Sequence, residues 1–187
     1  MKFILASQSP RRKEILERIS LDFKVINSNI DESIISIHMD PCKYSVKLAE
    51  LKAEKISIQN PNYTVIGADT IVSINNKILN KPKDFTEAKA MLNLLNGRIH
   101  EVITGVSLKN KSLDIDESFY DVSFVSFYKL NDNEISNYIN NYKPFDKAGS
   151  YGIQGYAGLF IKEIKGSYDN IVGFPISKFY QIIKKYF

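Results

Sequence analysis

The stretch YTVIGADTIVSI, residues 63–74, says most about the fold, because its β-branched side chains predict a buried strand. The sequence GADT is expected to interrupt this strand, with Gly67 and Ala68 leaving room for another group to approach the backbone. Asp69 would then project from the strand end into a crevice, a common place for a metal ligand or a general base. The alternative is an aspartate that only caps a turn.

The rest of the chain alternates between short apolar runs and amphipathic helical patterns. Strands are expected at residues 2–6, 23–26, 101–108, 117–128 and 159–164, helices from Pro10 and at residues 44–58, 86–95, 134–142 and 175–186, and glycine-bounded loops at residues 149–158 and 166–175. This order predicts an α/β fold with a mixed sheet flanked by helices. The 187 residues suffice for two lobes around a cleft, and we expect residues 1–187 to form a single domain.

The composition limits the classes of function. Hydrophobic residues make up 44% of the chain and charged residues 25%, which is ordinary for a globular protein. The net charge of +4 suits an anionic small molecule better than nucleic acid, because the basic residues are spread along the chain. The single cysteine, Cys42, excludes an intrachain disulfide. No apolar run is long enough for a signal peptide or a membrane span, so we expect a cytoplasmic protein.

Two arginines stand at an electrostatically unfavourable place in LASQSPRRKEIL, residues 5–16. Ser9 can cap a helix whose first residue is Pro10, which puts Arg11 and Arg12 at the positive end of the helix dipole. That arrangement is favourable if an anion binds there, with the hydroxyls of Ser7 and Ser9 completing a phosphate cradle. The alternative, that both arginines point into water, is equally open at this stage.

Five further polar residues are candidates for a site. Glu32 could supply a second carboxylate, and paired carboxylates from separate segments can hold Mg²⁺. Lys52 flanks the apolar face of its predicted helix, Lys81 is held by a following proline, and Lys147 precedes the glycine-rich loop. Gln154 lies in that loop and offers a donor and an acceptor to the planar edge of a ligand. Taken one at a time, each charged residue is better explained as a solvated surface group, and the Gln154 segment can be a tight loop that joins a helix to a strand.

Together these segments resemble the Maf family of nucleoside triphosphate pyrophosphatases. The resemblance covers nearly the whole chain and rests on LASQSPRR (residues 5–12), Glu32, Lys52 in LKA, GADT (67–70), KP (81–82), NGRIHEVITGV (96–106), DKAGSYGIQG (146–155) and GSYDNIVGFP (166–175). So many motifs in one order are more specific than any of them alone.

The resemblance implies a fold like that of inosine triphosphate pyrophosphatases, and hydrolysis of a nucleoside triphosphate to the monophosphate and pyrophosphate with Mg²⁺ or Mn²⁺. It implies that Asp69 is the proton acceptor, that Glu32, Lys52 and Lys81 lie in the catalytic cleft, and that Arg12, Thr70 and Gln154 influence base preference. The GADT and GIQG forms look like the dTTP/UTP subgroup, and homodimers are usual among relatives. Our hypothesis is that Glu32 and Asp69 share the metal, while Arg11, Arg12, Lys52 and Lys81 neutralise phosphate charge.

Two other classes of function remain open at the level of sequence: a non-catalytic nucleotide-sensing regulator of cell division, and an RNA-binding module. Aromatic residues are 12% of the chain and could stack on bases. No stripe of alternating basic and aromatic residues is visible, however, and acids recur among the motif positions, where they would repel a phosphate backbone. His38 and His100 lie far apart without a partner pattern, so neither is expected to act in catalysis.

Overall fold

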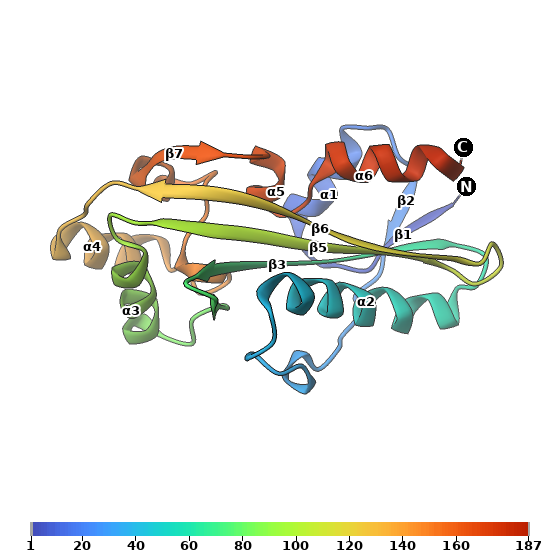
Figure 1. Ribbon diagram of the computed structural model, residues 1–187, viewed down its shortest axis with the longest axis horizontal. Helices are drawn as coiled ribbons and strands as arrows, with labels where there is room; N and C mark the ends of the chain where they lie inside the picture. The colour runs from blue at the N-terminus through green and yellow to red at the C-terminus, as the bar shows by residue number, and fades with distance from the viewer. Residues whose placement is uncertain (1, 187) are drawn as a thin grey trace.

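The computed structural model describes residues 2–186 and is built on a seven-stranded mixed sheet (Figure 1). The strands are β1 (Phe3–Leu5), β2 (Phe23–Val25), β3 (Thr64–Ile74), β4 (Lys77–Leu79), β5 (Ile99–Asn110), β6 (Ile115–Phe127) and β7 (Ile161–Lys165). Their order is β2-β1-β3-β5-β6-β7, with β4 paired to β3 beside this path. β1 runs parallel to β2 and β3, and the other pairs are antiparallel. The predicted mixed sheet is therefore confirmed.

Helices cover both faces of this sheet. They are α1 (Pro10–Glu17), α2 (Pro41–Gln59), α3 (Phe85–Leu95), α4 (Asp132–Tyr142), α5 (Tyr168–Val172) and α6 (Ile176–Ile183), with 3₁₀ turns at Glu32–Ile34, Ala148–Ser150, Tyr156–Phe160 and Lys184–Tyr186. In Figure 1, α2 lies below the long strands, while α1 and α6 lie above them. The predicted flanking helices are present, with ends that differ by a few residues from those expected.

Two local predictions were wrong. Residues 166–175 were expected to be a loop, but they contain α5, whose start is capped by Ser167 and whose end is set by Gly173 at φ 133°. The Ser167 hydroxyl accepts a hydrogen bond from the backbone N–H of Asn170, as an N-cap does. The strand expected at residues 159–164 begins later, because the 3₁₀ turn Tyr156–Phe160 precedes β7.

The long strands β3, β5 and β6 contribute to the two largest hydrophobic clusters, one at each end of the molecule. At one end Val72 and Val102 pack with residues of α3 and α4. At the other end Ile66 and Val106 pack with residues of α1 and α6. The protein therefore has two lobes that share three strands, as Figure 1 shows along its long axis.

β3 is continuous through Asp69, so the prediction of an interrupted strand with Asp69 at its end was wrong. Residues Val65 to Ser73 pair with β5 without a break, and Asp69 stands opposite Gly105. The interruption is instead in the strands on the other side, because β1 pairs with residues 64–66 and β4 with residues 72–74. The edge of β3 between them, residues 67–71, is the stretch that neither short strand covers.

The open edge of β3 makes two neighbouring side chains, Asp69 and Thr70, accessible from the same side of the strand. Successive side chains of a strand point to opposite faces of the sheet, so Asp69 and Thr70 leave β3 in opposite directions. Asp69 contacts Lys52 on α2, and Thr70 contacts Arg12 on α1. Because no strand covers the edge here, one ligand beside β3 can reach both side chains.

The glycines of β3 and β5 make room for α2, so the group that approaches the backbone at Gly67, as predicted, is a helix of the protein itself. A Cβ at Gly67 would lie 2.1 Å from the carbonyl oxygen of Ala49, and a Cβ at Gly105 would lie 2.4 Å from that of Ser45. Both distances are far below van der Waals contact, so only glycine allows the helix backbone to lie this close. This close packing brings the middle of α2 next to the open edge of β3.

Two further predictions concern the start of α1 and the membrane. The Ser9 hydroxyl accepts a hydrogen bond from the backbone N–H of Arg12 at 3.4 Å, and Pro10 is the first helical residue, which confirms the predicted cap. Within residues 2–186, no helix combines the length and the apolar character needed to cross a bilayer.

Replacing Gly105 with alanine should lower the free energy of unfolding by about 3 kcal/mol, because the new methyl group overlaps the backbone of Ser45. Urea unfolding followed by circular dichroism measures this loss. Gly155→Ala is the matched control, since its Cβ would lie 3.8 Å from the nearest atom, the carbonyl oxygen of Gly152. Equal stability of the two variants would contradict the role given to Gly105.

Candidate functional site

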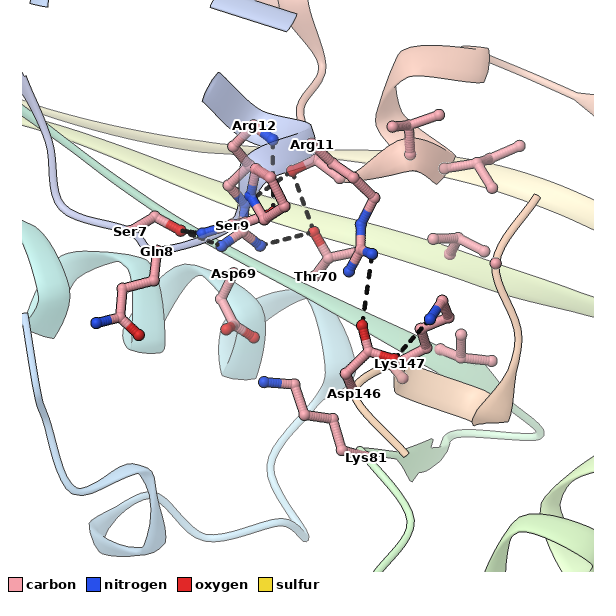
Figure 2. Close-up of a pocket in the computed structure, with 18 of the residues that line it drawn as sticks. Ser7, Gln8, Ser9, Arg11, Arg12, Asp69, Thr70, Lys81, Asp146 and Lys147 are labelled. Atoms are coloured by element: carbon pink, nitrogen blue, oxygen red, sulfur yellow. Dashed lines mark hydrogen bonds and ion pairs between the residues drawn. The ribbon is translucent and has the colours of Figure 1, made fainter. Parts of the chain in front are cut away.

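A single cavity of about 540 Å³ lies between the two lobes, at the open edge of β3. All eleven residues singled out from the sequence line it: Ser7, Ser9, Arg11, Arg12, Glu32, Lys52, Asp69, Thr70, Lys81, Lys147 and Gln154. They come from α1, α2, β3, the 3₁₀ turn after β2 and the loops after β1, β4 and α4, so residues far apart in sequence line one hollow. Figure 2 shows several of them pointing into it. The predicted cleft between two lobes is therefore present.

A lysine and two carboxylates form the most closely packed charged group in the cavity. The ammonium nitrogen of Lys52 lies 2.6 Å from Asp69 Oδ1 and 2.8 Å from Glu32 Oε1. Lys52 and Asp69 are buried, whereas the Glu32 side chain is about half exposed. Lys52 reaches Asp69 because Gly67 lets α2 approach the sheet. The expectation that Lys52 does not point straight into solvent is confirmed.

Lys81 adds a second positive charge beside the same carboxylates. Figure 2 shows its ammonium group and the carboxylate of Asp69 pointing toward one another. Burial raises the pKa of Glu32, but Lys52, Lys81 and Arg12 together outweigh it, and the pKa lies below its ordinary value. Glu32 is therefore ionised at neutral pH and adds its charge to that of Asp69.

The guanidinium of Arg12 is held by three groups of the protein itself. Its Nε donates to the carbonyl of Gly173, one terminal nitrogen donates to Ser7 Oγ and the other to Thr70 Oγ1, each at 3.0 Å. Burial lowers the pKa of Arg12, and the opposing charge of Asp69 raises it again in part. A guanidinium has five N–H groups, so two remain for a ligand.

The phosphate cradle of two serines and two arginines stays a prediction, and the structure adds how these four side chains are held. All four residues line the cavity, but the Ser7 hydroxyl accepts from Arg12 and the Ser9 hydroxyl caps α1. The sequence alone could not show this, because Arg12 is held by Gly173 and Thr70 from distant segments. Arg12 therefore ties α1 to β3 and α5, and Arg11 is the arginine that reaches across the cavity.

Arg11 reaches across the cleft to the other lobe. Its guanidinium lies 3.6 Å from Asp146 Oδ2, and the other oxygen of Asp146 lies 2.5 Å from the ammonium of Lys147 (Figure 2). Burial raises the pKa of Asp146, but Lys147 and Arg11 outweigh it, so the pKa lies below its ordinary value. Asp146 was not predicted as a site residue, although it directly precedes Lys147 in the glycine-rich motif.

The glycine-rich segment contributes Gln154 and Tyr151 to the cavity wall. Gln154 is exposed, so its amide is accessible from the cavity. Tyr151 is buried, and its hydroxyl lies 2.7 Å from Nε2 of His100 on β5. Burial lowers the pKa of His100 to about 4, so the imidazole is neutral at pH 7. The contact between His100 and Tyr151 thus anchors the segment to the sheet.

Sequence reasoning missed a polar turn on the cavity wall. Asn27, Ser28 and Asn29 lie one residue beyond the end of β2, and all three line the cavity. β2 is parallel to β1, and ligands of α/β proteins commonly bind beyond the carboxyl ends of parallel strands. That rule, applied to the run of Asn and Ser after the predicted second strand, could have identified them.

The cavity of this α/β fold thus contains a buried lysine between two acids, and further cations line the same hollow. A family model described as "Maf-like protein" matches residues 2–186, and the chain belongs to that family. This confirms the resemblance seen in the motifs.

Curated relatives match over their full length. A "dTTP/UTP pyrophosphatase" of Clostridioides difficile (strain 630) is 46% identical over 187 residues, which are 100% of this chain and 96% of the relative. Another, of Carboxydothermus hydrogenoformans, is 42% identical over 186 residues, which are 100% of this chain and 99% of the relative. Among solved structures, the Staphylococcus aureus Ham1 protein is 16% identical, with a TM-score of 0.49 over 68% of this chain and 72% of that one.

Replacing Lys52 with methionine should lower the free energy of unfolding by about 3 kcal/mol, because it leaves the buried Asp69 carboxylate without its cation. Adding Asp69→Asn to that variant should restore part of the loss, since the unpaired charge is then removed. Urea unfolding of both single variants and the double variant measures this coupling. Strictly additive losses would show that the two side chains do not interact in solution.

Stability should fall in acid because of His100. Its pKa is about 4 in the folded protein, against an ordinary histidine value of 6.5, so between these values the unfolded chain binds the proton and the folded one does not. The stabilising contribution is complete above pH 6.5 and is lost as the pH falls toward 4. From pH 7 to pH 5, the stability difference between the wild type and His100→Gln should shrink by roughly 2 kcal/mol in urea unfolding. A constant difference would contradict a neutral buried imidazole.

Proposed function

We propose that this protein is a nucleoside triphosphate pyrophosphatase that hydrolyses dTTP and UTP to the monophosphate and pyrophosphate. The observation that carries the proposal is the Asp69–Lys52 pair, with nitrogen and oxygen 2.6 Å apart, inside a cavity that is also lined by Arg11, Arg12 and Lys81. The names of relatives that match over their full length support the same activity and the choice of bases.

The cations around the cavity suit a triphosphate. Arg11, Lys81 and Lys147 come from three different segments and surround the same hollow as Asp69. Charged N–H groups form strong hydrogen bonds with phosphate oxygens, and they stabilise the charge that grows on a leaving pyrophosphate. Arg11 and Lys147 share Asp146, and phosphate oxygens would replace that carboxylate as their partner.

Asp69 is the proposed proton acceptor. Water attacks the α-phosphorus, a new P–O bond forms, and the bond to the bridging oxygen breaks as pyrophosphate leaves with the electron pair. The proton of the attacking water passes to the Asp69 carboxylate, which the contact with Lys52 holds in one orientation. The burial of Asp69 and Lys52 limits the water that can reach them, and this strengthens the electrostatic interaction between their charges.

The acids also fit a divalent metal. Glu32 and Asp69 both contact the ammonium of Lys52 through one carboxylate oxygen, so the two acids lie side by side and each has a second oxygen left. Two carboxylates together with substrate phosphates and water are a usual ligand set for Mg²⁺ or Mn²⁺. Within residues 2–186 no group of three or more His, Cys, Asp or Glu side chains is arranged to hold a metal. When bound between these two acids, the metal would supply charge neutralisation at the phosphates.

Base preference is proposed for Arg12, Thr70 and Gln154, following the family pattern. Gln154 is exposed at the cavity, and its amide could complement the carbonyl and N3–H of a pyrimidine. Arg12 retains two N–H groups beyond its three contacts with the protein. By analogy with the family we also propose a homodimer that acts in the cytoplasm as a single domain, without nucleic-acid or membrane partners.

Pyrophosphate release from each NTP and dNTP with Mg²⁺ or Mn²⁺ tests the proposal. We expect turnover of dTTP and UTP, and Asp69→Asn should lower kcat by roughly 10²–10⁴-fold, which is the usual size of a general-base contribution. The matched control is Asp116→Asn, an exposed acid on β6 whose ion pair with Lys109 lies outside the cavity residues. Near-normal kcat in Asp69→Asn would remove Asp69 from this role.

The same assay separates the alternatives. Tight nucleotide binding without turnover would favour a nucleotide-sensing regulator. Binding to RNA that weakens steeply with salt, again without turnover, would favour an RNA-binding module.

A further inference from the structure

A chain of buried hydrogen bonds continues behind Arg12 into the interior. Arg12 donates to Thr70 Oγ1 at 3.0 Å, Thr70 Oγ1 lies 2.9 Å from Thr104 Oγ1, and Thr104 Oγ1 donates to the carbonyl of Asn170 at 3.1 Å. Thr70 and Thr104 stand directly opposite each other on β3 and β5. We call these four residues the Arg12 hydrogen-bond chain. Its inner members, Thr104 and Asn170, are fully buried and are not among the residues that line the cavity.

The two ends of this chain have fixed roles. A guanidinium only donates and a backbone carbonyl only accepts. Thr70 Oγ1 accepts from Arg12, and its own proton has two acceptors within reach, Thr104 Oγ1 at 2.9 Å and the Gly173 carbonyl at 3.3 Å. Because Thr104 Oγ1 donates its own proton to the Asn170 carbonyl, it can accept from Thr70. Without the Thr104 hydroxyl, the Thr70 proton is left with the more distant Gly173 carbonyl or a group in the cavity.

Asn170 also has a structural role, because its side chain anchors α5 to the sheet. Its amide nitrogen donates to the carbonyl of Val102 and to Ser123 Oγ, both at 3.0 Å. α5 has only five residues, so it depends on such anchors. The end of α5 presents the Gly173 carbonyl that accepts from Arg12 Nε. Asn170 therefore holds Arg12 by two routes, through Thr104 and through Gly173.

We propose that Thr104 and Asn170 are positioning residues for nucleotide selection. They orient the Thr70 hydroxyl and the Gly173 carbonyl, and these two groups hold the guanidinium of Arg12 with two N–H groups left for the nucleotide. The inference rests on the proposed function, since it assigns selection to the same cavity. A purely structural role would affect stability without changing which nucleotide is bound.

The test compares Thr104→Val, which removes the hydroxyl at nearly the same volume, with Thr104→Ser, which keeps it. Loss of one oriented hydrogen bond should lower the ratio of kcat/KM for dTTP over CTP by about tenfold in Thr104→Val, through a higher KM for dTTP with little change in kcat. Thr104→Ser should keep the ratio close to that of the wild type. If Thr104→Val does not fold, Thr104→Ala removes the same hydroxyl and replaces it in the comparison.

A matched control is Ser107→Ala on the same strand. Ser107 is buried, and its hydroxyl accepts from Ser118 Oγ outside the Arg12 hydrogen-bond chain. Its loss should leave the ratio unchanged. An unchanged ratio and KM in the Thr104 variant that lacks the hydroxyl would overturn the proposal, even if that variant is less stable. The proposal would also be overturned if the ratio fell as far in Thr104→Ser and in Ser107→Ala as it does in Thr104→Val.

Binding measurements separate this inference from the proposed function. Calorimetry with the α,β-methylene analogues of dTTP and CTP needs no turnover, so it reports selection even if the protein is not an enzyme. Discrimination by the wild type that weakens in Thr104→Val and returns in Thr104→Ser supports the inference, whether or not pyrophosphate is released. Equal affinity of the wild type for both analogues would overturn the inference, because the protein would then not discriminate between these nucleotides.

Discussion

The close contact between α2 and the sheet is the constraint on which the site depends. Gly67 and Gly105 have no side chains to hold the helix away, and a Cβ at either would overlap the backbone of α2. Because the helix lies this close, the buried ammonium of Lys52 comes within 2.6 Å of Asp69. A helix held away by even one methyl group on each strand would leave two acids without their cation in a partly buried place, which is costly.

The open edge of β3 then gives one ligand access to both faces of the sheet. On one face Asp69 meets Lys52, and on the other Thr70 meets Arg12. In the proposed function, adjacent residues of β3 have different roles. Asp69 accepts the proton on the α2 side, and Thr70 contributes to nucleotide selection on the α1 side. The two lobes share β3, β5 and β6, so the relative position of the two groups is set by a regular strand that pairs with β5 without a break.

Much of this arrangement could be predicted from local patterns and motifs. The helical periodicity located α3, the Ser-Pro pair located the start of α1, and the motifs identified eleven residues that line one cavity. The errors have a common origin. β3 was expected to break at Asp69 because its continuous pairing with β5 is invisible in the sequence, and residues 166–175 were expected to be a loop because α5 is anchored by segments distant in sequence.

By itself the sequence determined what depends on neighbours along the chain: which segments are helix or strand, where α1 is capped, and which residue types gather in motifs. Capping, periodicity and turn chemistry act over a few residues, so they can be read directly. Only the tertiary structure decided that the break lies in the strands beside β3, that Lys52 stands between two acids, and that a buried chain of hydroxyls holds Arg12. These features arise from contacts between segments that folding brings together, and hydrogen-bond partners at that range are set by packing.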